Sequence, residues 1–364
     1  MRMNNFFKII AIVAFMFLQP GPKVFASESS TVAEPAEEVN VKELILDHLA
    51  DSYEWHITKI GETHLSIPLP VIVYSSTGWN VFMSSAFHGG HEHNGLYIAK
   101  EGPFKGKIVE KSTTGAEIRP FDISITKNVA SLLFASMLLI FIILSVARSY
   151  KKDVFESKGG FMGFMEMFIM NINDDVIKPC IGKDYKKYAP YLLTVFFFIL
   201  INNLMGLIPI FPGGANVTGN IAITFVLALC TFVIVNVSGT REYWREIFWP
   251  DVPMWLKVPI PLMPVIELVG VFTKPFALMV RLFANILAGH SIVLGLTCLV
   301  FVTVKLGVSM NASMSFVSVL FSVFIDLVEL LVAYIQAYVF TMLSAVFIGL
   351  ARIEPHHPKE KANH

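Results

Sequence analysis

Residues 279 to 292, MVRLFANILAGHSI, place charged and polar side chains within an otherwise apolar stretch. Arg281 keeps its positive charge at every accessible pH, and carrying an arginine to the bilayer centre costs roughly 2.5 to 3.5 kcal/mol on insertion scales. At about 100° per helical residue, Arg281 shares a stripe with alanines, and Asn285 lies at its edge. Small residues let another backbone approach closely, so we expect this face to meet protein and not lipid. The stripe comprises Ala277, Arg281, Ala284 and Ala288.

Further ionisable residues flank Arg281 in the same stretch. Lys274 and Glu267 continue its stripe at heptad steps, although Pro275 can kink the helix between them. His290 lies nine residues beyond Arg281 and therefore on the opposite side of a helix. His290 is thus excluded as the local partner of the arginine.

A second polar set lies in SVFIDLVELLVAYIQAYVFTML, residues 322 to 343. Glu329 and Gln336 are seven residues apart on one helical face, with Ala333 between them. A carboxylate without a partner in an apolar medium takes up a proton, so Glu329 and Asp326 are candidate proton carriers.

The expected topology orders these groups by depth in the membrane. If the block with Arg281 runs from inside to outside and the last block returns, polar groups lie on both sides of the arginine. Two aqueous half-passages would then be separated by a permanent charge that repels a proton crossing directly. The outer set is His290, Asp326 and Glu329, and the inner set is Glu267 and Lys274.

The same residues also allow structural roles. Arg281 can form a buried ion pair with Glu329 or Glu267, and His290 can be a hydrogen-bonded core residue. The two amides can be ordinary hydrogen bonders between helices. Several ionisable groups in two adjacent apolar blocks favour transport, because such groups are rare in membrane spans.

Composition places the whole chain in the membrane class. Of 364 residues, 54% are hydrophobic and 15% are charged, which is too apolar for an ordinary soluble domain. The formal net charge is zero and basic residues are scattered, which argues against a nucleic-acid partner.

The N-terminal third differs from the rest. Residues 1 to 26 begin with basic residues, continue with a short apolar run and end in small residues typical of a cleavage site, which predicts a signal peptide. An uncleaved membrane anchor is the alternative. Residues 27 to 122 would then form an exported extension. Within it, short segments rich in Val, Ile, Tyr and Trp between 53 and 115 predict a small β-rich domain. The sequence AFHGGHEHNG carries His88, His91 and His93 with Glu92, but without an evident fourth ligand we favour a solvated loop over a metal site.

Five apolar blocks follow, and they predict an all-α polytopic membrane domain over residues 123 to 352. The last two are about twice as long as one upright span needs, so each is either a re-entrant pair or one tilted helix. Lys and Arg near the span ends favour five crossings with the C-terminal tail, 353 to 364, in the cytoplasm of the cell. The segment 160 to 177 predicts an interfacial amphipathic helix. The blocks are 129–147, 190–211, 220–238, 262–304 and 316–350.

RLFANILAGH at 281 to 290, together with ELLVAYIQAYVFTML at 329 to 343, resembles subunit a of F-type ATP synthases. PYLLTVFFFILINNLMGLIPIFP at 190 to 212 and VGVFTKPFALMVRLFAN at 269 to 285 are similar to other parts of that family. The resemblance covers about residues 120 to 352, and it leaves the exported extension without a family counterpart.

The resemblance implies a non-catalytic subunit of the inner membrane that needs no cofactor. Arg281 would face the carboxylate of each passing c subunit, drive release of its proton and block leakage between the half-passages. Asn285 and Gln336 match polar positions near the arginine, and His290 and Glu329 match an interacting pair in the access passage. Implied partners are the c-ring, a peripheral-stalk b subunit, membrane lipid and, indirectly, the soluble F1 head; the ion can be H⁺ or Na⁺.

Two other classes of function explain less of the sequence. A proton-coupled solute transporter would use Arg281 to bind an anionic substrate, but the sequence lacks the internal repeats typical of such proteins. A receptor with a ligand-binding exported domain would leave the intramembrane charges unexplained.

Overall fold

The computed structural model describes most of the chain after residue 49. The predicted signal peptide, the first part of the extension and the C-terminal tail lie outside the described residues. The described ranges are 50–60, 63–111, 117–152, 159–208, 213–249, 262–304 and 307–352.

The N-terminal part is β-rich, as the sequence predicted. Its strands form three small antiparallel sheets with the orders β1-β2, β4-β3-β8 and β5-β6-β7. Strand alternation buries Val71 and Val73 of β3 completely, where they pack with Leu96 and Ile108. The strands are β1 (Glu54–Ile60), β2 (Thr63–Pro68), β3 (Pro70–Ser75), β4 (Gly78–Met83), β5 (Leu96–Ile98), β6 (Ile108–Lys111), β7 (Glu117–Ile118) and β8 (Phe121–Asp122), with the 3-10 helix η1 (Ser84–Gly90).

The remainder is helical and contains five segments long and apolar enough to cross a membrane among the described residues. This confirms a polytopic membrane protein with five candidate spans. A short helix that the sequence did not predict, α8, lies between the third and fourth spans. The helices are α3 (Lys127–Lys152), α4 (Phe161–Asn171), η2 (Ile172–Ile177), α5 (Lys178–Ile181), η3 (Gly182–Asp184), α6 (Tyr185–Leu207), α7 (Ile221–Ser238), α8 (Arg241–Phe248), α9 (Leu262–Thr303) and α10 (Val308–Ala351).

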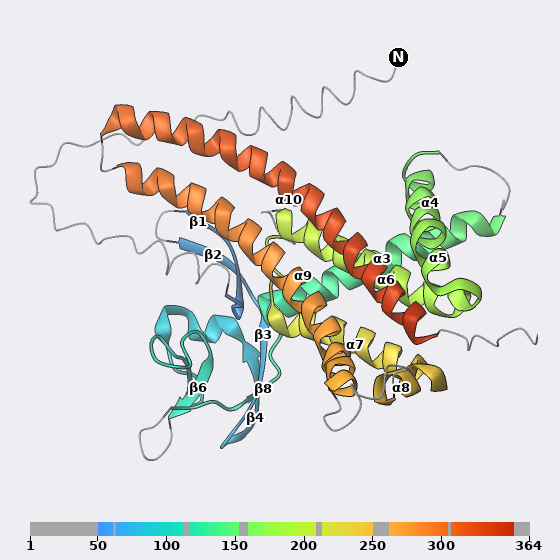
Figure 1. The fold of residues 1–364 in the computed structure, drawn as a ribbon. Helices are drawn as coiled ribbons and strands as arrows, with labels where there is room; N and C mark the ends of the chain where they lie inside the picture. Colours follow the sequence, from blue (N-terminus) through green and yellow to red (C-terminus); the bar gives the residue numbers. More distant parts are fainter. Residues whose placement is uncertain are drawn as a thin grey trace, which may run out of the picture. The chain divides into compact units, whose positions relative to one another are not determined.

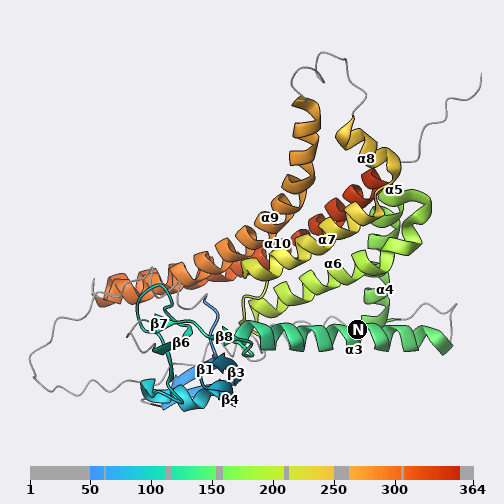
Figure 2. The ribbon, with the colours of Figure 1, turned by 90° about the horizontal axis from the view of Figure 1, so that it is seen from below.

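Helices α9 and α10 are each continuous, with 42 and 44 residues, so neither long block is a re-entrant pair. They lie side by side (Figure 1) and make the most extensive contact between two elements of the described chain. Figure 2 shows α9 changing direction in its first half, where Pro275 removes one backbone hydrogen bond. The start predicted for α10 at 316 is wrong: the helix begins at Val308, directly after Gly307 with φ 104°.

Helix α6 forms the centre of the membrane domain. Leu192, Phe196 and Ile199 are completely buried and pack with residues of α9 and α10 such as Leu282 and Phe340. The next turn of α6 carries polar and small residues instead, and this turn forms one wall of the candidate site.

The segment predicted as an interfacial helix is helical but extends into the core. Ile172 and Ile177 of η2 are completely buried, whereas Phe164 and Met167 of α4 are more than half exposed. Its depth in a membrane stays a prediction.

Candidate functional site

A hydrogen bond between α9 and α10 joins two of the predicted site residues. The Nδ2 of Asn285 donates to the Oε1 of Gln336 over 2.8 Å, and Gln336 is only 3% exposed. If the buried Gln336 amide lost this partner, the cost would be about 1 to 3 kcal/mol. The hydrogen bond therefore favours one register of the two helices.

A small cavity adjoins this pair and extends toward the end of α9 and the beginning of α10. His290, Asn285 and Glu329 line it together with Asn203 of α6. Its volume of about 20 Å³ is enough for one water molecule. The buried Oε1 of Glu329 has no hydrogen-bond partner among the described residues, which makes it a natural acceptor for such a water.

The wall formed by α6 contains residues that the sequence analysis missed. Asn203 is 3% exposed, accepts a hydrogen bond of 2.6 Å from Thr218 and donates one of 3.4 Å to the Ala333 carbonyl. Gly206 lies beside His290, since a Cβ built on it would be 3.5 Å from His290 Nε2. Two consecutive asparagines, 202 and 203, inside an apolar span were the signal available in the sequence.

Arg281 does not belong to this cavity. Its side chain is exposed, and Ala277, Ala284 and Ala288 of the same stripe are exposed as well. No ion pair joins Arg281 to Glu329 or Glu267 in the part of the chain that the structure describes, so the alternative of a buried structural bridge is not found. The stripe is therefore available to another chain.

Asp326 is also separate from the cavity. It lies about one turn before Glu329 on α10, is exposed, and is absent from the cavity lining. Of the outer set expected from the sequence, His290 and Glu329 line the cavity and Asp326 does not, although Asp326 lies only about 60° around the helix from Glu329.

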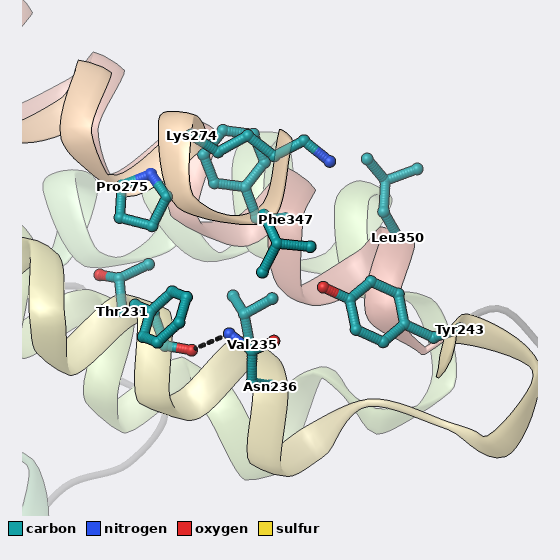
Figure 3. A pocket seen from close by; sticks show the side chains of 10 residues that line it. Thr231, Val235, Asn236, Tyr243, Lys274, Pro275, Phe347 and Leu350 are labelled. Atoms are coloured by element: carbon teal, nitrogen blue, oxygen red, sulfur yellow. Dashed lines mark hydrogen bonds between the residues drawn. The ribbon is translucent and has the colours of Figure 1, made fainter. Parts of the chain in front are cut away.

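A second small cavity, of about 20 Å³, lies toward the beginning of α9 (Figure 3). Its polar lining consists of Lys274, Thr231 and Asn236 of α7, and Tyr243 of α8. Figure 3 shows the Tyr243 hydroxyl directed into the cavity. The buried Oδ1 of Asn236 has no hydrogen-bond partner within the described ranges. Burial, and then the charge of half-buried Glu267, raise the pKa of Tyr243. Of the predicted inner residues, Lys274 lines this cavity and Glu267 does not, although its charge acts on Tyr243. Asn236 and Tyr243 were not predicted from the sequence.

The histidine-rich loop does not assemble a metal site in the part described. The ring of His93 packs on Phe82 with centroids 4.6 Å apart, and Glu92 forms an exposed ion pair of 3.0 Å with Lys111. No three His, Cys, Asp or Glu side chains gather anywhere in the described ranges, which do not include the side chain of His88.

Comparison with known proteins matches the two parts of the chain separately. The family model "ATP synthase A chain" matches residues 129–349, and "Domain of unknown function (DUF8433)" matches residues 44–127. The chain is 44% identical over 250 residues to ATP synthase subunit a 2 of Prosthecochloris aestuarii, covering 67% of this chain and 73% of that protein. It is 40% identical over 255 residues to ATP synthase subunit a of Chloroherpeton thalassium (68% and 72%) and 42% identical over 242 residues to that of Myxococcus xanthus (65% and 75%).

Proposed function

This chain belongs to the ATP synthase A chain family, and from that premise we propose that it conducts protons through two offset half-passages beside a rotating c-ring. Members of this family are non-catalytic membrane subunits of the F0 sector. Flow through the two passages would couple the proton gradient to ATP synthesis in the attached F1 head.

The observation that carries the proposal is the placement of two small cavities, each with several polar side chains in its lining, on either side of Arg281 along α9. One is lined by Lys274 and the other by His290, seven residues before and nine residues after the arginine. At 1.5 Å per residue these steps are about 10 Å and 14 Å, which places Arg281 between the two cavities along the helix axis.

The exposed stripe around Arg281 fits the c-ring as its partner. A guanidinium attracts a carboxylate strongly only at short range in a low dielectric, and it then stabilises the ionised form. A carboxylate carried past on the ring would lose its proton beside Arg281 and regain one on leaving it. The three alanines of the stripe leave room for that approach.

The outer half-passage is assigned to the cavity with His290, Glu329 and Asn203, and the inner one to the cavity with Lys274 and Tyr243. In this orientation the N-terminal domain is on the exported side of the membrane and the C-terminus is cytoplasmic. A b subunit would link this chain to the F1 head. Family membership favours this function over a solute transporter that binds an anion at Arg281.

Replacing the arginine tests the proposal. In inverted vesicles, Arg281→Ala should abolish ATP-driven proton pumping while the complex still co-purifies with its c subunits. Arg245→Ala is the matched control, because Arg245 is an exposed arginine of α8 whose contact with Glu242 is a loose 3.9 Å. Normal pumping by an assembled Arg281→Ala complex would refute the mechanism.

A further inference from the structure

The N-terminal β domain contacts the membrane helices through a buried tryptophan. Trp55 of β1 is 5% exposed and packs in one cluster with Ala215 and Val217, each 1% exposed. Two hydrogen bonds fix the adjacent chain: Lys127 N donates to the Ser52 carbonyl over 2.8 Å, and Asn128 N donates to Asp51 Oδ1 over 3.1 Å. The contact therefore joins the start of β1 to the start of α3 and to the segment before α7.

The segment contacted by Trp55, residues 213 to 220, is folded tightly between α6 and α7. Gly214 N donates to the Met205 carbonyl over 3.2 Å, and Gly219 N donates to Asn216 Oδ1 over 2.9 Å. A Cβ on Gly219 would collide with the Asn216 side chain, so this turn has little space for rearrangement. A displacement of its buried end would thus shift the whole segment.

The same segment reaches the outer cavity at two points. Thr218, 1% exposed, donates its hydroxyl hydrogen to Asn203 Oδ1 over 2.6 Å, and this bond orients the Asn203 amide toward Ala333. The Ala215 carbonyl lies against Gly206, the residue that also borders His290. Trp55 therefore contacts a segment whose other side sets the wall of the cavity.

We propose that the β domain, which matches a domain of unknown function, positions the outer proton site, and that Trp55 is the positioning residue. A buried tryptophan covers roughly 150 to 250 Å² and so fixes the surface against which it packs. By holding residues 215 to 218, it fixes the amide of Asn203 and the space available to His290. This inference rests on the proposed function of the His290 cavity.

The test measures passive proton flux through the membrane sector of vesicles from which the ATPase head has been removed. The variants are Trp55→Ala, Trp55→Phe, Thr218→Val and the double variant Trp55→Ala with Thr218→Val. Val71→Ala is the matched control, because Val71 is completely buried in the separate core of the same domain. Co-purification of c subunits with each variant measures assembly.

Trp55→Ala should reduce the flux by about three- to tenfold, Trp55→Phe should restore most of it, and Val71→Ala should keep it within about twofold. The proton flux of the double variant should be no lower than that of the poorer single variant, because both changes release the amide of Asn203. Additive losses, or a flux in Trp55→Ala equal to that of the unchanged protein, would overturn the inference. If Trp55→Ala does not assemble, Ile67→Ala, a smaller deletion in the same cluster, decides by the same criteria.

His290→Ala separates this inference from the proposed function. If His290→Ala loses proton flux while assembled Trp55→Ala keeps full flux, the β domain does not position the site. The outer passage would then still be supported. Full flux in His290→Ala would overturn both.

Discussion

Glu329 of α10 lies directly against the backbone of Gly289 in α9. A Cβ built at position 289 would overlap the Glu329 carboxylate, so any larger residue there would force this side chain to move. Gly295, two turns farther along the same helix, has nothing within 4 Å of a Cβ. The present position of the Glu329 carboxylate therefore depends on the glycine at 289, whereas Gly295 has no such role.

Gly289→Ala should displace the Glu329 carboxylate and reduce ATP-driven proton pumping by about tenfold. Overpacking typically costs about 1 to 3 kcal/mol, and about 1.4 kcal/mol of barrier is tenfold in rate. Gly295→Ala is the control and should pump within about twofold of the unchanged protein. Equal pumping by the two assembled variants would mean that the position of Glu329 does not limit transport.

Gln336→Leu should leave the Asn285 amide without its 2.8 Å acceptor and reduce pumping by about five- to tenfold. Asn285→Leu should act similarly, and the double variant should be no worse than the poorer single variant. Thr297→Val is the control, since among the described residues the Thr297 hydroxyl bonds to the Val293 carbonyl of its own helix. Strictly additive losses in vesicle pumping assays would show that the pair does not act as a unit.

If His290 and Glu329 serve one proton passage, exchanging the two residues should retain part of the proton pumping. The combined change His290→Glu with Glu329→His retains one imidazole and one carboxylate at the shared cavity. Proton pumping by this double variant should exceed that of either single variant. A double variant that is worse than both would contradict a shared role, and c-subunit co-purification controls for assembly.

The stability of the β domain should fall at alkaline pH because of Tyr53. Its ring is 4% exposed and its hydroxyl donates to Asp122 Oδ2; burial first, and then the bond to Asp122 and its charge, raise the pKa of Tyr53. The folded domain thus keeps the Tyr53 proton at a pH above about 10, where the unfolded chain loses it. The contribution of Tyr53 to the free energy of unfolding is therefore complete below about pH 10 and is lost as the pH rises further.

Thermal unfolding followed by the fluorescence of Trp55 and Trp79, with the other tryptophans replaced by Phe, measures this effect. The midpoint should drop between about pH 9 and pH 11, and Tyr53→Phe should make the drop smaller. Tyr74→Phe, a change to a half-exposed ring, should leave the drop unchanged. An identical drop in Tyr53→Phe would assign the alkaline sensitivity to another group.

Local pattern was sufficient for most of the elements. The apolar blocks gave α3, α7 and α9 to within a few residues, because a span needs an uninterrupted run of apolar side chains. The apolar block begins only at 316 because several residues between 308 and 316 are polar. The helix α10 nevertheless includes them and begins at Val308, because polar residues do not interrupt a helix as Gly307 does. The amphipathic α8 in a charged loop was missed for the related reason that eight residues give a weak periodicity.

The sequence alone determined that Arg281, Asn285, His290, Glu329 and Gln336 lie in two apolar helices, because residue type and helical spacing are local properties. Only the tertiary structure decided which of them meet. Asn285 bonds to Gln336, Glu329 joins His290, and Asp326 and Arg281 remain outside the cavity. Asn203, Thr218 and Trp55 enter through contacts between elements far apart in the chain, and these depend on how α6, the 213–220 segment and β1 pack.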